Sequence, residues 1–311
     1  MLANPSFPRP SSLPVTTSVP SPSYFLGCPV WACDQWKGEI FPRTAKQREF
    51  LKFYSRIFKT VEGNSTFYGI PSTDTFQRWA HDTDEGFRFA LKMPGVITHE
   101  KQLVAVDTEM ELFLEGLEIL YRADRLGPTF IQLPPGFGPA QMPQLETFLN
   151  NLPAQYPFAV EFRHHDYFKE PLLSSINELL FDLKRDRVIF DSRPLYSMPA
   201  SDASEQAAQK RKPRSPICET VTHQCPFLRL IGRNNPLQNL QWVEHWAERV
   251  VDWIKQGFTP YVFTHTANDA LAAKFAKYFH SEVQKRMPLP DLPTVASATP
   301  QKTFHFSDEP F

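Results

Sequence analysis

Along the chain, short apolar runs alternate with longer segments in which hydrophobic residues recur at helical spacing. The apolar runs have the length and the β-branched or aromatic content of strands. They lie at Tyr24–Gly27, Thr60–Glu62, Phe87–Met93, Thr129–Leu133, Phe158–Arg163, Val188–Asp191, Phe227–Ile231 and Pro260–Thr264. Helices are predicted between them, at Lys46–Lys59, Thr73–Ala80, Glu109–Tyr121, Leu145–Leu152, Leu172–Leu183, Trp242–Lys255 and Ala270–Lys285.

This alternation is typical of parallel βαβ units. A chain of 311 residues could hold two modest domains or one large α/β barrel. Eight predicted strands that alternate with helices favour the second alternative, a single TIM (β/α)8 barrel over residues 23–293.

Three segments do not follow the alternation. Residues 1–22 are rich in Pro and Ser, cannot bury a core, and are predicted to be a disordered tail, and 294–311 form a second tail. Between Ser192 and Pro226 the pattern predicts no helix, so a flexible insertion is expected at about 197–220. The basic run KRKPR in this insertion is interpreted as a solvated linker in preference to a nucleic-acid patch.

Composition describes an ordinary globular protein, with 41% hydrophobic and 22% charged residues. The net charge of −1 provides no overall field for nucleic acid, so such binding is not favoured. No apolar run reaches the roughly 18 residues of a membrane helix. Cys28, Cys33, Cys218 and Cys225 are irregularly spaced, which argues against a secreted disulfide framework and favours a reduced, cytoplasmic location, with a four-cysteine zinc site as a weak alternative.

Polar side chains stand at or just after nearly every predicted strand end. In parallel α/β proteins the C-terminal strand ends carry the active site. We therefore predict a catalytic or binding site here, although each residue alone has a structural interpretation. The catalytic candidates are Glu62, Lys92, Glu161, Arg163 and Asp191, and the substrate-binding candidates are Trp31, Asn64, Phe67, Tyr68, His99, Gln132, Arg229 and His265.

Ion pairs could explain part of this set without any function. Glu161 and Arg163 are two residues apart and so face the same side of a strand. Lys92 could pair with Glu62, and Arg163 with Asp191, across the sheet.

Several segments resemble the YecE-like family, also called the domain-of-unknown-function 72 family. In chain order they are YFLGCPVW, TVEGNSTFYGIPS, FRFALKMPGVITHEKQL, LGPTFIQLPPGF, FAVEFRHHDYF, VIFDS, PFLRLIG and PYVFTHTAND. The resemblance covers about Tyr24 to Pro293. The resemblance implies a fold similar to a TIM barrel. It implies no activity.

Three functions remain open from the sequence. The first is an enzyme, for example a hydrolase, that acts on an anionic substrate, with Lys92, Arg163 and Arg229 holding phosphate or carboxylate and Glu161 or Glu62 as general base. The second is a metal-dependent phosphodiesterase or nuclease, with Glu62, Glu161, Asp191 and His265 as metal ligands. The third is a non-catalytic binding protein. A glycosidase-like carboxylate pair is a further possibility, because Glu62, Glu161 and Asp191 could flank a sugar. The interleaved cations disfavour a metal, and the oligomeric state is not predicted.

Overall fold

The computed structural model describes residues 24–295, so the predicted N-terminal tail and nearly all of the predicted C-terminal tail lie outside it. All eight predicted strands form, close to their predicted positions. They are β1 (Phe25–Gly27), β2 (Thr60–Gly63), β3 (Arg88–Leu91), β4 (Thr129–Gln132), β5 (Phe158–Glu161), β6 (Asp186–Asp191), β7 (Phe227–Ile231) and β8 (Tyr261–His265).

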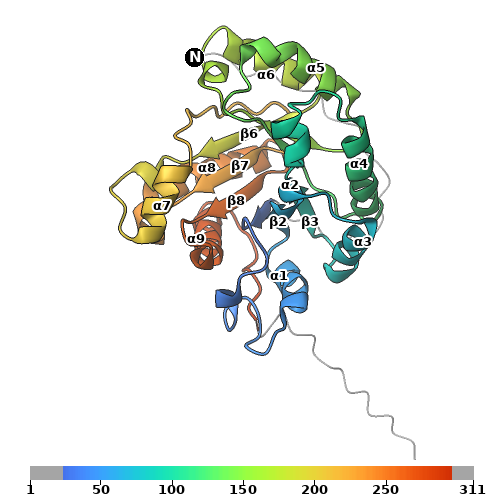
Figure 1. Cartoon of the computed structure of the whole chain (residues 1–311). Helices are drawn as coiled ribbons and strands as arrows, with labels where there is room; N and C mark the ends of the chain where they lie inside the picture. Colours follow the sequence, from blue (N-terminus) through green and yellow to red (C-terminus); the bar gives the residue numbers. More distant parts are fainter. Residues whose placement is uncertain (1–23, 296–311) are drawn as a thin grey trace, which may run out of the picture.

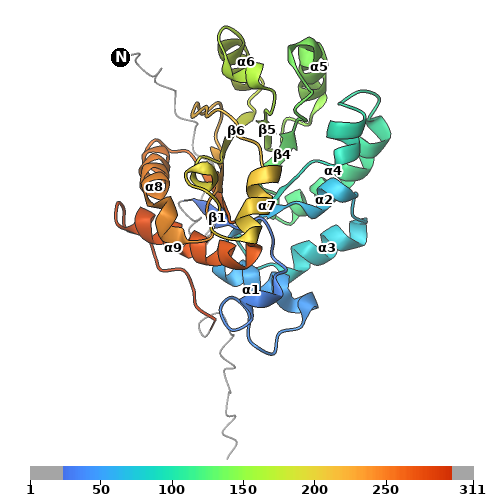
Figure 2. The same ribbon diagram turned by 60° about the vertical axis from the view of Figure 1, so that its left-hand side comes forward.

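The seven predicted helices are also present, and two more accompany them in this part of the chain. The predicted ones are α1 (Phe50–Ile57), α3 (Thr73–Asp82), α4 (Asp107–Arg122), α5 (Met142–Asn151), α6 (Leu172–Asp182), α8 (Leu240–Lys255) and α9 (Ala272–Gln284). The additional ones are the short α2 (Ser65–Tyr68) and α7 (Ala203–Arg211). In Figures 1 and 2 the strands occupy the centre and helices surround them.

The prediction of one closed eight-stranded TIM barrel is wrong. All strand pairs are parallel, but they form a six-stranded sheet in the order β1-β8-β7-β6-β5-β4 and a separate two-stranded sheet of β2 and β3. The ladder of backbone hydrogen bonds is interrupted at two seams. The first seam lies between β1 and β2, and the second lies between β3 and β4.

At the first seam a side chain takes the place of the ladder. The Tyr54 hydroxyl accepts the Cys28 N–H (2.8 Å) and donates to Thr60 O (3.0 Å), so the strand backbones are bridged by a phenol. The Glu62 N–H still donates to Cys28 O (3.0 Å). A Cβ at Gly27 would lie 2.1 Å from Thr60 O, so the close approach of these two strands requires glycine.

At the second seam the pairing shifts register by one residue. Phe89 pairs with Leu126, and Lys92 pairs with Phe130. The segment that leads into β4 therefore has one more residue between the two pairs than the β3 segment has. Pro128 lies in this bulge and has no N–H to donate. A continuous ladder cannot pass through it.

The core has two layers. An inner apolar cluster fills the space between the strands and contains Phe25, Ala90, Phe130, Ala159, Val188, Phe227, Tyr261 and Phe263. A larger outer cluster lies between strands and helices, with Trp36, Trp246 and Trp253 among its largest fully buried side chains. Among residues 24–295 no helix has both the length and the apolarity to cross a bilayer.

Helix α7 corrects the prediction that residues 192–226 contain no helix. Figure 1 shows it beyond the arrowheads of β6, β7 and β8, that is, on the side where the strands end. Its sequence has little amphipathic pattern, and only Glu205 and Ala208 are buried on it.

Candidate functional site

A buried arginine occupies the centre of the C-terminal strand ends. Arg229 of β7 donates to both carboxylate oxygens of Glu62 on β2, from Nε (2.8 Å) and from Nη2 (2.7 Å). Its Nη1 donates to Oε2 of Glu161 on β5 (2.5 Å). One guanidinium thus joins three strands through charge-assisted hydrogen bonds, which are the strongest kind between side chains. It lies above the inner apolar cluster, with its Cζ 5.0 Å from the centre of the Phe130 ring.

The three charges stabilise one another's ionised forms. Burial alone would raise the pKa of Glu62 and of Glu161, but the neighbouring guanidinium groups outweigh it and hold both pKa values below their ordinary range. Burial would lower the pKa of Arg229, and the two carboxylates raise it instead. Neither carboxylate is therefore suited to act as a general base near neutral pH, for which a pKa close to the working pH is needed.

Arg163 adds a second guanidinium beside this centre. It forms an ion pair with Glu161 and lies over the ring of Phe190, with its Cζ 3.9 Å from the ring centre. Its Nη2 also approaches Gln132 Oε1 (3.4 Å). Its Nε is buried and has no hydrogen-bond partner among the described residues. The predicted same-side pairing of Glu161 and Arg163 is confirmed, whereas Arg163 does not pair with Asp191.

Lys92 follows β3 and remains half-buried. Its Nζ lies 3.8 Å from the centre of the Phe67 ring on α2, and it does not pair with Glu62. Burial, followed by the positive charge of Arg229, lowers the pKa of Lys92 to about 8. Helix α2 is held against this strand end because the Thr66 hydroxyl donates to Lys92 O (2.6 Å).

Two histidines and an asparagine complete the cluster. His265 of β8 is hydrogen-bonded through Nε2 to Glu62 Oε2 (2.9 Å), and Asn64 donates to Glu62 Oε1 (2.8 Å). The ring of His99 meets the Phe67 ring edge-on, with the two ring centres 4.9 Å apart. Burial and the charge of Lys92 lower the pKa of His99 to about 4, and burial also lowers the pKa of His265, so both imidazoles are neutral at pH 7.

Lys212 is a member of this cluster that the sequence did not reveal. It lies in the KRKPR run, is half-buried, and interacts electrostatically with Arg229, Glu62 and Arg163. Burial and the charge of Arg229 lower its pKa to about 8. No periodic signal marks this lysine, because its position depends on how the segment after β6 folds back over the strand ends.

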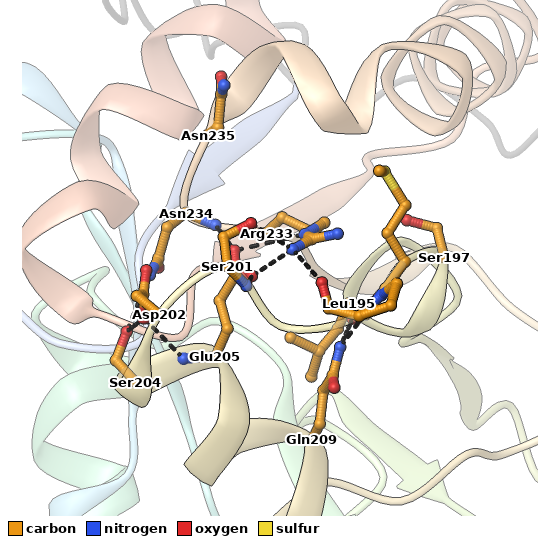
Figure 3. A network of polar contacts seen from close by, with 12 residues as sticks. Leu195, Ser197, Ser201, Asp202, Ser204, Glu205, Gln209, Arg233, Asn234 and Asn235 are labelled. Carbon is orange, nitrogen blue, oxygen red and sulfur yellow. Dashed lines mark hydrogen bonds and ion pairs between the residues drawn. The ribbon is translucent and has the colours of Figure 1, made fainter.

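That segment is attached by a buried polar network, shown in Figure 3. Arg233, just after β7, pairs with Glu205 of α7, and both side chains are almost inaccessible (0% and 1% exposed). Arg233 also donates to Pro199 O (2.8 Å), and the Asn234 side chain donates to Asp202 Oδ2 (2.7 Å). Helix α7 ends at Arg211, so this network positions Lys212.

Two predicted site residues lie elsewhere, and a third, Tyr68, contacts Phe67 edge-on but is largely exposed. Asp191 points away from the cluster, because its neighbour Phe190 faces Arg163 and successive strand residues face opposite sides. Asp191 instead binds Arg193 through both oxygens and accepts the Trp246 indole N–H (2.8 Å). Trp31 packs against Trp79 and Phe89 in the outer core. Tyr68 is 87% exposed.

Three of the four suggested metal ligands, Glu62, Glu161 and His265, come together, but they do so around the guanidinium group of Arg229. Glu62 and Glu161 both face Arg229, and Asp191 lies in its own network. Within residues 24–295 no group of three or more His, Cys, Asp and Glu side chains has an arrangement that could hold a metal ion. Trp31, Phe67 and Tyr68 likewise form no common platform for stacking bases.

The fold and the cluster define a class: a parallel α/β protein whose C-terminal strand ends carry a buried, mixed-charge site. The model of the family described as protein of unknown function DUF72 matches residues 25–300. The chain belongs to this DUF72 family, as its sequence motifs predicted.

Relatives and solved structures agree with this assignment. The chain is 32% identical over 265 residues to the UPF0759 protein YecE of Escherichia coli K12, which covers 85% of this chain and 94% of YecE. It is 27% identical over 135 residues to the UPF0759 protein YunF of Bacillus subtilis 168, covering 42% of this chain and 48% of YunF. A crystal structure of a DUF72 family protein from Thermotoga maritima MSB8 has a TM-score of 0.65, 25% identity, and coverage of 84% of this chain and 99% of that one.

Proposed function

We propose that this protein is an enzyme for a small substrate bearing a carboxylate or phosphate group, which binds at the C-terminal ends of the strands. The observation that carries the proposal is an excess of positive charge in the cluster. Its cationic side chains are Lys92, Arg163, Lys212 and Arg229, and its carboxylates are Glu62 and Glu161.

The carboxylates are already engaged by the arginines. In the described part of the chain, Lys92 and Lys212 have no carboxylate within ion-pair distance. An anion would supply the missing counter-charge to two half-buried ammonium groups and to the free Nε of Arg163. Lys92, Phe67 and His99 are each half-buried, so part of each of these side chains is exposed to solvent. The four cysteines are free thiols, which supports a reducing, cytoplasmic location for the activity.

Removing either lysine charge is expected to weaken anion binding. With sulfate and phosphate as probes, K92Q and K212Q should each raise Kd by about tenfold, or about 1.4 kcal/mol. Isothermal titration calorimetry measures Kd directly. K210Q is the matched control, because Lys210 lies two residues from Lys212 but is exposed. Equal effects of K210Q and K212Q, or no anion binding by the unmodified protein, would contradict the proposal.

Sulfate affinity is also expected to fall as pH rises through about 8, where both lysines lose their protons. Sulfate keeps its charge over this range, so the change in affinity arises from titration of the protein.

The free energy of unfolding of the unliganded protein should instead rise with pH. The pKa of each lysine is lower in the folded protein than in the unfolded chain. Between pH 8 and the ordinary lysine pKa of about 10.4, the unfolded chain therefore binds more protons than the folded protein. The contribution of these two lysines to the stability of the fold consequently increases over that pH range. A sulfate affinity that stays unchanged up to about pH 10 would contradict the prediction on binding.

A further inference from the structure

The amine of Lys92 has an unusual environment for a lysine. It lies over the Phe67 ring, and among residues 24–295 its Nζ has neither a hydrogen-bond acceptor nor an ion-pair partner. The backbone that carries it is fixed on both sides: Lys92 N donates to Gly63 O (3.0 Å), and Lys92 O accepts the Thr66 hydroxyl. The amine is thus held in place without a negatively charged partner.

Phe67 is itself closely positioned. A Cβ on Gly95 would lie 3.0 Å from Phe67 O and 3.1 Å from the ring carbon Cζ, so the loop after β3 contacts Phe67 at a glycine. The ring therefore presents one side to Lys92 and an edge to His99. The amine and the imidazole are brought together around a single aromatic side chain.

Burial and neighbouring cations are the two conditions that favour the neutral, nucleophilic form of a lysine amine. Both act on Lys92, whose pKa of about 8 leaves a useful neutral fraction at pH 7. Lys212 has a similar pKa. It follows α7 in a loop, however, and no described aromatic ring lies beneath its amine.

We propose that Lys92 is a nucleophile whose Nζ forms an imine with the carbonyl carbon of a small substrate that also bears a carboxylate or phosphate. This inference rests on the proposed function, because the anionic group is held by Arg163 and the other cations of the cluster. The substrate class is then narrowed to anionic aldehydes and ketones.

The reaction is balanced without a redox partner. The Nζ lone pair adds to the carbonyl carbon, the C–O π electrons move to oxygen, and a proton moves from nitrogen to oxygen to give a carbinolamine. The nitrogen lone pair then expels the hydroxyl group, which leaves as water after taking a second proton. One amine and one carbonyl thus yield one imine and one water. Water carries these protons, because the lowered pKa of His99, about 4, makes its imidazole too weak a base to accept them at neutral pH.

Glyoxylate with sodium cyanoborohydride tests the proposal, since reduction of the imine leaves a stable N-carboxymethyl group that peptide mass spectrometry locates. We expect Lys92 to be labelled at least about tenfold faster than the exposed Lys52 and Lys210 of the same sample. The uncharged methyl ester of glyoxylate should lose this preference, and K92R should abolish the fast site whereas K212R should retain it. The ratio of the labelling rate at Lys92 to that at Lys52 should be largest below about pH 8 and fall towards about pH 10, because an ordinary lysine continues to gain neutral amine over that range and Lys92 does not.

Labelling of Lys92 no faster than of Lys52 would overturn the imine proposal. If sulfate still binds and K92Q still weakens it, the anion site stands and Lys92 is only an electrostatic ligand. If sulfate does not bind at all, the proposed function fails as well. A further outcome is that glyoxylate and its methyl ester label Lys92 equally fast. This result would show a reactive amine that does not depend on an anion site, and it would also contradict the proposal.

Discussion

Replacing Arg229 by leucine is expected to lower the free energy of unfolding by about 3–5 kcal/mol, because it leaves two buried carboxylates without their shared counter-ion. Glu62 and Glu161 are both fully buried, and Arg229 supplies three hydrogen bonds to them. His265 and Asn64 would still contact Glu62, but Asn64 carries no charge and burial lowers the pKa of His265. Urea denaturation at pH 7 measures the loss as a lower midpoint with an unchanged slope.

The pH dependence identifies the cause of this loss. In the unmodified protein the pKa values of Glu62 and Glu161 are lowered, so their contribution to stability is present above the ordinary carboxyl pKa and disappears as pH falls through the folded values. In R229L the carboxyl groups take up protons more readily. The difference in stability between the two proteins should therefore be largest at neutral pH and narrow towards pH 4.

A double variant provides the control. Because burying ions is costly in itself, R229L combined with E62L should regain part of the lost stability, since Glu62 is removed and Glu161 keeps Arg163 as its ion-pair partner. If R229L is as stable as the unmodified protein at pH 7, the cluster contributes no stability. If the double variant is no more stable than R229L, lost packing rather than charge explains the effect.

The sequence predicted the strands and most helices because each buries an apolar pattern that is visible locally. The strand Phe227–Ile231 was predicted with its observed bounds. Helix α7 was missed because its interior is polar and its main contact, between Glu205 and Arg233, is tertiary. Closure of the sheet was predicted wrongly for a similar reason: the seams depend on a single Tyr54 hydroxyl and on Pro128, which strand counting does not take into account.

For the site, the position of a residue at a strand end was predictable, but the direction of its side chain was not. The C-terminal strand ends bring together Glu62, Glu161 and Arg229, as expected from parallel strands. Asp191 also stands at a strand end, yet a difference of one residue turns it from the cluster to Trp246. An ion pair of Lys92 with Glu62 was one structural explanation, but Lys92 lies on Phe67, and Arg229 binds both oxygens of that carboxylate.

Replacing Arg233 by leucine is expected to cost about 3–5 kcal/mol as well, and to weaken anion binding although Arg233 lies outside the charged cluster. The substitution leaves Glu205 buried without its cation and removes the hydrogen bonds to Pro199 O and the Ser201 hydroxyl. Helix α7 would then lose its main attachment to the end of β7. Since Lys212 directly follows this helix, its amine would no longer be held near Arg229.

Two measurements separate this effect from general destabilisation. Limited proteolysis at 25 °C should cut R233L within residues 197–214 well before the remaining chain unfolds, and the sulfate Kd should rise as in K212Q, with K92Q adding its own effect. R249L is the matched control: Arg249 on α8 pairs with Glu219, but both side chains are about one-third exposed, so its loss should cost no more than about 1 kcal/mol and leave sulfate binding unchanged. If R233L loses stability but binds sulfate as tightly as the unmodified protein, α7 is a purely structural attachment and Lys212 does not belong to the anion site.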